Sequence, residues 1–195
     1  MMWERKERNC SSIVTPLPAT ITRERVISTL HNHAEMIELN PLVVRYDRIK
    51  VPAHAPAEEF PWAWFQLTDK LFRFPRRMVF GEVTYKASFN DLPHGLQTHV
   101  YAPGGLDIKT KWTVEGQVIN EPREHDNSSP NGAPRETLYL REDVDMRCHM
   151  LMTTFVRRTL RNAHDGLVKE LIANAGAPRR RGENAAGGSH SRSSD

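Results

Sequence analysis

The chain has 195 residues, of which 38% are hydrophobic and 26% charged, with a formal net charge of +3. This length suits one domain with its own core, and the low apolar share indicates that some segments stay disordered. The head 1–10 and the tail 178–195 carry the whole positive surplus, so the body between them is formally neutral. A neutral body lacks the basic face that nucleic-acid binding needs.

Cysteine content and the N-terminus bear on where the protein works. Cys10 and Cys148 are too few for a disulfide framework and form no CxxC motif, so we expect free thiols. The first ten residues lack the apolar core of a signal peptide, and no run approaches the length of a membrane span. We therefore expect a cytoplasmic protein without a transmembrane segment.

The first elements are a short strand and a helical region. Residues 12–18 contain two prolines, which is typical of an edge strand. Thr22 is a favourable N-cap, apolar residues follow at helical spacing as far as Ile37, and Asn40-Pro41 ends the pattern. The length fits either one helix or two short helices with a bend.

From Leu42 the apolar period changes from helical to two, which indicates antiparallel strands with one covered face. A change of phase within the segment 42–51 predicts a bulge near Arg48. The loop 121–135 has no large apolar side chain, so we expect it to be disordered. The strands are predicted at 42–51, 62–67, 83–89, 96–101, 106–115 and 137–146.

A long helix closes the chain. Apolar residues from Met152 to Leu171 recur in steps of four and three, and the pattern ends near 174–176, ahead of Pro178. The residues 176–195 are rich in Arg, Gly and Ser and are predicted to be a disordered tail.

This order of elements resembles the helix-grip fold of the START-like, or SRPBCC, superfamily, which includes relatives of the birch-pollen allergen and polyketide cyclase/aromatases. Residues 23–41 resemble its opening helices and 150–171 its closing helix. The run Leu-Met-x-x-Phe-Val-Arg-Arg-Thr-Leu at 151–160, with His164, resembles uncharacterised fungal members. The resemblance implies an α+β fold. A curved antiparallel sheet of about six to seven strands wraps around the long C-terminal helix, with one or two short helices after the first strand. We expect a flexible head at 1–10 and a single START-like domain at 11–175.

The resemblance also implies a cavity between the sheet and the closing helix, in which a hydrophobic small molecule or lipid binds. The alternative is that the same side chains fill a packed core, since inward apolar residues are expected in both cases. The inward phase of the strands and helix predicts this lining: Val83, Tyr85, Phe89, Thr98, Val100, Ile108, Thr110, Trp112, Val144, Phe155, Val156, Thr159, Leu160 and Ala163.

Three residues are candidates for acid–base chemistry in such a cavity: Glu142, His164 and Tyr85. Glu142 occupies the apolar phase of its strand, where a lone carboxylate is costly to bury. We favour the alternative that a bulge turns Glu142 to solvent or that an arginine pairs with it. For His164 we favour a position at the helix boundary beside Asp165.

Other reactive side chains give weaker signals. His31 and His33 are two apart on a helix and do not chelate together, so we expect no metal and no cofactor. His99 lies in the outward phase of its strand and is predicted to be solvated, and Cys148 to be a buried structural thiol.

The aromatic residues Trp62, Trp64 and Phe65 precede a stretch of four basic residues. This combination is compatible with an RNA surface or with transient membrane contact. We favour a plain strand with solvated edge charges. The basic residues are Lys70, Arg73, Arg76 and Arg77.

Three functions follow from these observations. We favour a non-catalytic carrier of a hydrophobic small molecule or lipid, since no nucleophile or phosphate-binding motif is present. The alternatives are a cyclase/aromatase-like enzyme acting on a polyketide-type intermediate, and a protein-interaction module with a filled core. The ligand and the oligomeric state stay open.

Overall fold

The structure is a computed structural model that describes residues 6–73, 78–118 and 136–175. The strands are β1 (Lys6–Pro16), β2 (Val43–Ile49), β3 (Ala63–Arg73), β4 (Met78–Leu92), β5 (Gly95–Ala102), β6 (Leu106–Val118) and β7 (Glu136–His149). The α-helices are α1 (Arg23–Leu30), α2 (His33–Glu38) and α3 (Met150–Ala175). Short 3-10 turns lie at Ala57–Glu59 and Pro103–Gly105.

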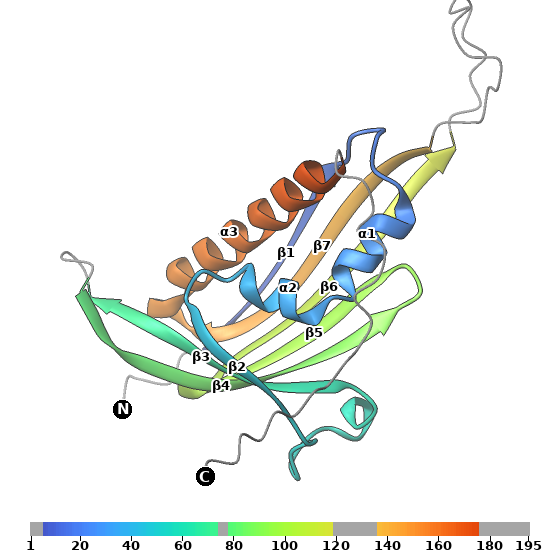
Figure 1. Ribbon diagram of the computed structural model, residues 1–195. Coiled ribbons are helices and arrows are strands. Elements are labelled where there is room, and N and C mark those ends of the chain that lie inside the picture. Colours follow the sequence, from blue (N-terminus) through green and yellow to red (C-terminus); the bar gives the residue numbers. More distant parts are fainter. Residues whose placement is uncertain (1–5, 74–77, 119–135, 176–195) are drawn as a thin grey trace, which may run out of the picture.

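The strands form one antiparallel sheet in the order β1-β7-β6-β5-β4-β3-β2. Figure 1 shows that the sheet is strongly curved and that α3 lies along its concave side, with α1 and α2 covering the remainder. This arrangement confirms the helix-grip architecture. Strands β2 to β7 lie in the sheet in the order of the sequence, whereas β1, which is followed by α1 and α2, lies at the edge beside β7. The segment 50–62 between β2 and β3 contains one of the 3-10 turns.

Side-chain caps explain why the helical region is divided into two short helices. Thr22 accepts a hydrogen bond from the Arg25 amide at 3.3 Å and begins α1. Asn32 accepts one from the Glu35 amide at 3.5 Å and begins α2. Both caps satisfy amides that the first helical turn leaves free. The two-helix alternative is therefore the one that the chain adopts.

Two boundaries differ from the sequence prediction. The first strand begins at Lys6 rather than near residue 12, because its backbone pairs with β7 as far as His149 and because Nε and Nη2 of Arg8 donate to the two carboxylate oxygens of Asp145. The irregularity in β2 lies between Val43 and Arg45 rather than near Arg48. The predicted disordered loop 121–135 and tail 176–195 lie outside the described residues.

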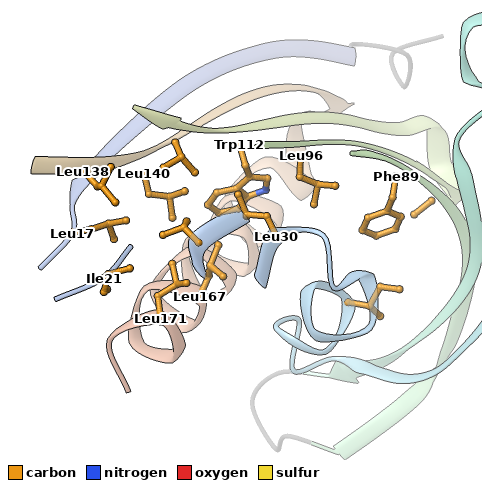
Figure 2. Close-up of a cluster of buried hydrophobic side chains, with 14 of the residues drawn as sticks. Leu17, Ile21, Leu30, Phe89, Leu96, Trp112, Leu138, Leu140, Leu167 and Leu171 are labelled. Carbon is orange, nitrogen blue, oxygen red and sulfur yellow. The ribbon is translucent and has the colours of Figure 1, made fainter. Parts of the chain in front are cut away.

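Fully buried leucines of the hydrophobic core gather at one end of the sheet, where α1 and the C-terminal part of α3 meet β1, β6 and β7 (Figure 2). Leu167 and Leu171 of α3 are fully buried there. Toward the N-terminus of α3, by contrast, Met152 and Phe155 stay exposed. The sheet and helix therefore pack tightly at one end and leave space at the other. The packed cluster includes Leu17, Ile21, Val26, Leu30, Leu138 and Leu140.

Candidate functional site

A cavity of about 300 Å³ lies at this looser end, between the N-terminal half of α3, the concave face of β3 to β6, and α2. Its walls are mainly apolar, and its volume is at the lower end of the range of small-molecule sites. Aromatic walls come from Tyr85, Phe89, Trp112 and Phe155.

All the residues predicted to line the cavity do so, except Val144. Val144 is buried in a small cluster with Met146, Cys148, Ile108 and Val156, of which the last two also line the cavity. Phe155 lines the cavity while 51% exposed, and Met152 while 36% exposed, so this part of α3 forms the opening.

Nearly half of the wall comes from positions that the sequence pattern did not single out. Helix α2 and the residues that follow it supply one side. The additional lining residues are Met36, Ile37, Leu39, Asn40, Leu42, Leu67, Asp69, Ala87, Ala102, Pro103, Leu106 and Met152. The acid–base candidate Glu142 also lines the cavity.

Glu142 and His164 form a buried pair at the cavity wall. Glu142 is 2% and His164 3% exposed, and Nδ1 of His164 lies 2.7 Å from Oε2 of Glu142. The favoured sequence interpretations of both residues are therefore wrong. The β6–β7 register runs without a bulge through Trp112↔Glu142, so the strand keeps Glu142 on the concave face. His164, 22 residues later on α3, is brought over it by the packing of the helix.

Two further contacts hold His164 in place. Its Nε2 lies 2.9 Å from the Thr15 hydroxyl of β1, and its ring stacks on Trp112 at 5.3 Å between centroids. A carboxylate only accepts hydrogen bonds, so the imidazole tautomer that fits an ionised Glu142 is the one with the proton on Nδ1. Thr15 does not line the cavity, whereas Glu142 does. Of these three hydrogen-bonded residues, Glu142 is therefore the one that a bound molecule would contact.

A second carboxylate faces the cavity from β3. Asp69 accepts a hydrogen bond from the Tyr85 hydroxyl at 3.0 Å and one from Nδ2 of Asn40 at 3.0 Å. Burial raises the pKa of Asp69 above its ordinary value, and these two hydrogen bonds offset part of the effect. Burial and the neighbouring Asp69 also raise the pKa of Tyr85 well above its ordinary value. Tyr85 is thus a hydrogen-bond donor that stays protonated at neutral pH.

The prediction of a solvated His99 is wrong. His99 is on the outer face of β5 as expected, but it is 3% exposed because the segment 51–62 covers that face. Its Nδ1 lies 2.5 Å from Oε1 of Glu59, which also accepts a hydrogen bond from Tyr101 at 2.9 Å. The other Glu59 oxygen accepts one from Ser88 at 2.8 Å. This cluster is on the side of the sheet opposite the cavity, and it fastens the covering segment.

The remaining candidates have structural surroundings. Trp64 is buried beside Tyr101 on the outer face, and Phe65 is buried in the core, so these two aromatic residues do not form an exposed surface. Cys148 is buried and Cys10 exposed. Among the described residues, no group of three or more His, Cys, Asp or Glu side chains is arranged to hold a metal ion.

A shallow depression of about 500 Å³ lies on the outer face of β1, β7, β6 and β5. Its walls carry charges of both signs, and Arg8 is already paired with Asp145 at 2.8 Å. It is open to solvent and is lined mostly by charged and polar residues, so the inner cavity is the better candidate site.

Comparison with solved structures shows that this fold is shared by proteins of very different sequence. Ara h 8.0201 superposes with a TM-score of 0.52 at 6% identity, over 86% of this chain and 100% of its own. The ZhuI aromatase/cyclase from Streptomyces sp. R1128 gives 0.52 at 10% identity, over 89% of this chain and 98% of its own. The di-domain aromatase/cyclase StfQ from the steffimycin biosynthetic pathway gives 0.52 at 14% identity, over 85% of this chain and 51% of its own. The chain therefore shares the helix-grip fold of these proteins.

Sequence comparison places the chain more narrowly. A family profile described as a domain of unknown function, DUF7053, matches residues 5–177. No curated protein matches the sequence. Within the described residues, no helix is long and apolar enough to cross a membrane.

Proposed function

The chain belongs to the DUF7053 family, and we propose that its domain binds a hydrophobic small molecule in the cavity beneath α3. The observation that carries this proposal is the contrast between the two ends of the core. One end is filled by fully buried leucines, whereas the other encloses about 300 Å³ behind an opening at Phe155. Protein interiors are close-packed, so an apolar space of this size indicates an occupant.

The size of the space limits the ligand. At about 30 Å³ for each water-sized group, the cavity takes roughly ten non-hydrogen atoms. A compact ring system or a short chain fits this volume, whereas a two-chain phospholipid would have to leave its tails outside. We therefore favour a small apolar compound over a bilayer lipid as the ligand.

The proposal is tested by native mass spectrometry of the purified protein, followed by denaturing extraction of anything that it carries. We expect an apolar compound bound one to one, or a rise in melting temperature when such compounds are added to extracted protein. If neither is observed across a panel of small apolar compounds, the cavity is not a ligand site and the filled-core interaction module is favoured instead.

A second candidate function is supported by the pair of Glu142 and His164. A carboxylate held at a cavity wall by a buried imidazole is suited to remove a proton next to a carbonyl group, as a cyclisation requires. Glu142 would be the catalytic residue and His164 a positioning residue. The variant Glu142→Gln tests the second function: an enzyme converts its ligand in the parent and loses this turnover in the variant, whereas a carrier converts no ligand in either protein.

A further inference from the structure

The charge of the cavity wall restricts the chemistry of the ligand more sharply than its shape does. Two carboxylates, Asp69 and Glu142, face the cavity from β3 and β7, which are separated in the sheet by β4, β5 and β6. Among the described residues that line the cavity there is no Lys, Arg or His. The charged groups of the wall are therefore all acidic.

Three hydrogen-bond donors of the wall are engaged within the protein. The Tyr85 hydroxyl and the Asn40 amide both donate to Asp69, and the Thr159 hydroxyl donates to the Phe155 carbonyl at 3.2 Å. The hydroxyls of Thr98 and Thr110 are neutral and cannot balance an anion. A carboxylate or phosphate inside the cavity would thus lose its hydration and meet groups of its own charge.

Glu142 has acceptor capacity left for a ligand. His164 occupies Oε2, and Oε1 has no hydrogen-bond partner among the residues that the structure describes. The residue is fixed from behind by His164, which itself is held by Thr15 and Trp112. Both oxygens of Asp69, in contrast, already accept a hydrogen bond. Glu142 is therefore the better anchor, and only a donor group can satisfy its free oxygen.

We propose that the cavity selects compact apolar molecules that carry a hydrogen-bond donor, a hydroxyl or an amine, which binds Oε1 of Glu142, and that it rejects anionic ligands such as fatty acids. This inference rests on the proposed binding function and adds the chemical class of the ligand. The apolar part of such a ligand contacts the aromatic walls formed by Trp112 and Phe89. A neutral hydroxyl and a cationic amine would both donate a hydrogen bond to Glu142, and the test below compares one ligand of each kind.

The test uses four naphthyl compounds substituted at the same ring position: naphthylmethanol, naphthylmethylamine, naphthoate and methylnaphthalene. Each has about a dozen non-hydrogen atoms, close to the size that the cavity accepts. Affinities for the full chain are measured by titration calorimetry at pH 7. We expect the alcohol or the amine to bind more tightly than methylnaphthalene, and naphthoate to bind about tenfold more weakly or worse than either donor.

The variant Glu142→Gln identifies the residue responsible. It should weaken the donor ligands by about tenfold and bring naphthoate closer to them, because an amide can also donate. Asp143→Asn is the matched control: Asp143 is the neighbouring residue on the outer face, it pairs with Arg141, and it does not line the cavity. The control should bind all four compounds as the parent does.

The outcomes separate the two levels of the proposal. If naphthoate binds as tightly as the donor compounds, or if methylnaphthalene does, the inference about ligand chemistry is wrong while the binding function stands. If none of the four binds, methylnaphthalene included, the binding function itself fails and the inference fails with it. Should Glu142→Gln fold poorly, the comparison of the four compounds in the parent protein still decides between these outcomes.

Discussion

At the scale of single residues, Glu142 and His164 are two polar side chains that are costly to bury, and they lie at the cavity wall, where a ligand would bind. Both side chains are buried, so each needs the other: removing one partner leaves a polar group without compensation. We predict that His164→Leu lowers the free energy of unfolding by about 3 kcal/mol, because it leaves a carboxylate alone in the wall. Glu142→Leu should cost less, since His164 keeps its contact with the Thr15 hydroxyl. Urea unfolding measures both changes.

The double variant Glu142→Leu/His164→Leu is the control for this prediction. It replaces both polar groups with apolar ones, so it should lie within about 1 kcal/mol of the parent. If the two single changes instead add up in the double variant, the pair is not energetically coupled and the 2.7 Å contact has no role in stability.

Asp69 gives a second prediction at this scale, concerning pH. A carboxyl whose pKa is raised by burial holds its proton more tightly in the folded than in the unfolded state. At pH values above the ordinary carboxyl pKa of 3.8, folding is therefore coupled to proton uptake. The contribution of Asp69 to stability falls as the pH rises from 3.8 through its folded-state pKa. We predict that Asp69→Asn gains stability relative to the parent as pH is raised from 4 to 7, as followed by urea midpoints.

The control for the pH prediction is Asp143→Asn. Arg141 lowers the pKa of Asp143 below 3.8, so the stability that this carboxylate contributes is lost only as the pH falls below that value. The difference between this variant and the parent should therefore stay nearly constant from pH 4 to 7. A constant difference for Asp69→Asn as well would show that the Asp69 carboxyl titrates normally in the folded protein.

At the scale of elements, the β4–β5 hairpin depends on a close approach at Gly95. A Cβ at this position would overlap the backbone of Trp112 in β6, whereas a Cβ at Gly81 of β4 meets nothing nearby. His31 at the end of α1 also binds the Gly95 carbonyl, with Nε2 at 2.9 Å. We predict that Gly95→Ala destabilises the protein by about 3 kcal/mol and that Gly81→Ala changes stability by about 0.5 kcal/mol or less. Equal effects in thermal unfolding would contradict the close approach.

The elements themselves could be predicted well from the sequence because strands and helices have fixed periods. The alternation in β4 to β6 correctly assigned Tyr85, Thr98 and Ile108 to the concave face, since a strand without a bulge cannot change its phase. The bulge in β2 was misplaced because a phase change in sequence does not say where the pairing slips.

At the scale of the whole molecule, the sequence could not show what the elements bring together. His99 was assigned to the correct face, but its burial depends on the segment that contains Glu59, 40 residues earlier. Likewise Glu142 and His164 each have a plain local explanation, and only the placement of α3 on β7 makes them a pair. The spacing of apolar residues predicts which face of a helix or strand is buried. It does not predict which residues of different elements come into contact, because this depends on how the elements pack together.

The cavity leads to a prediction that concerns the whole domain. A side chain that fills the cavity should lower the affinity for ligands without lowering the stability of the fold. Ala163 on α3 lines the cavity, so Ala163→Leu adds apolar side chain to an empty space without removing a contact. We predict that the variant is as stable as the parent or up to about 2 kcal/mol more stable, while its affinity for small apolar ligands falls about tenfold or more. Ala173→Leu, at an exposed position near the end of the same helix, should change neither property much. A large loss of stability in Ala163→Leu would instead mean that this end of the core is already filled, which would favour an interaction module over a carrier.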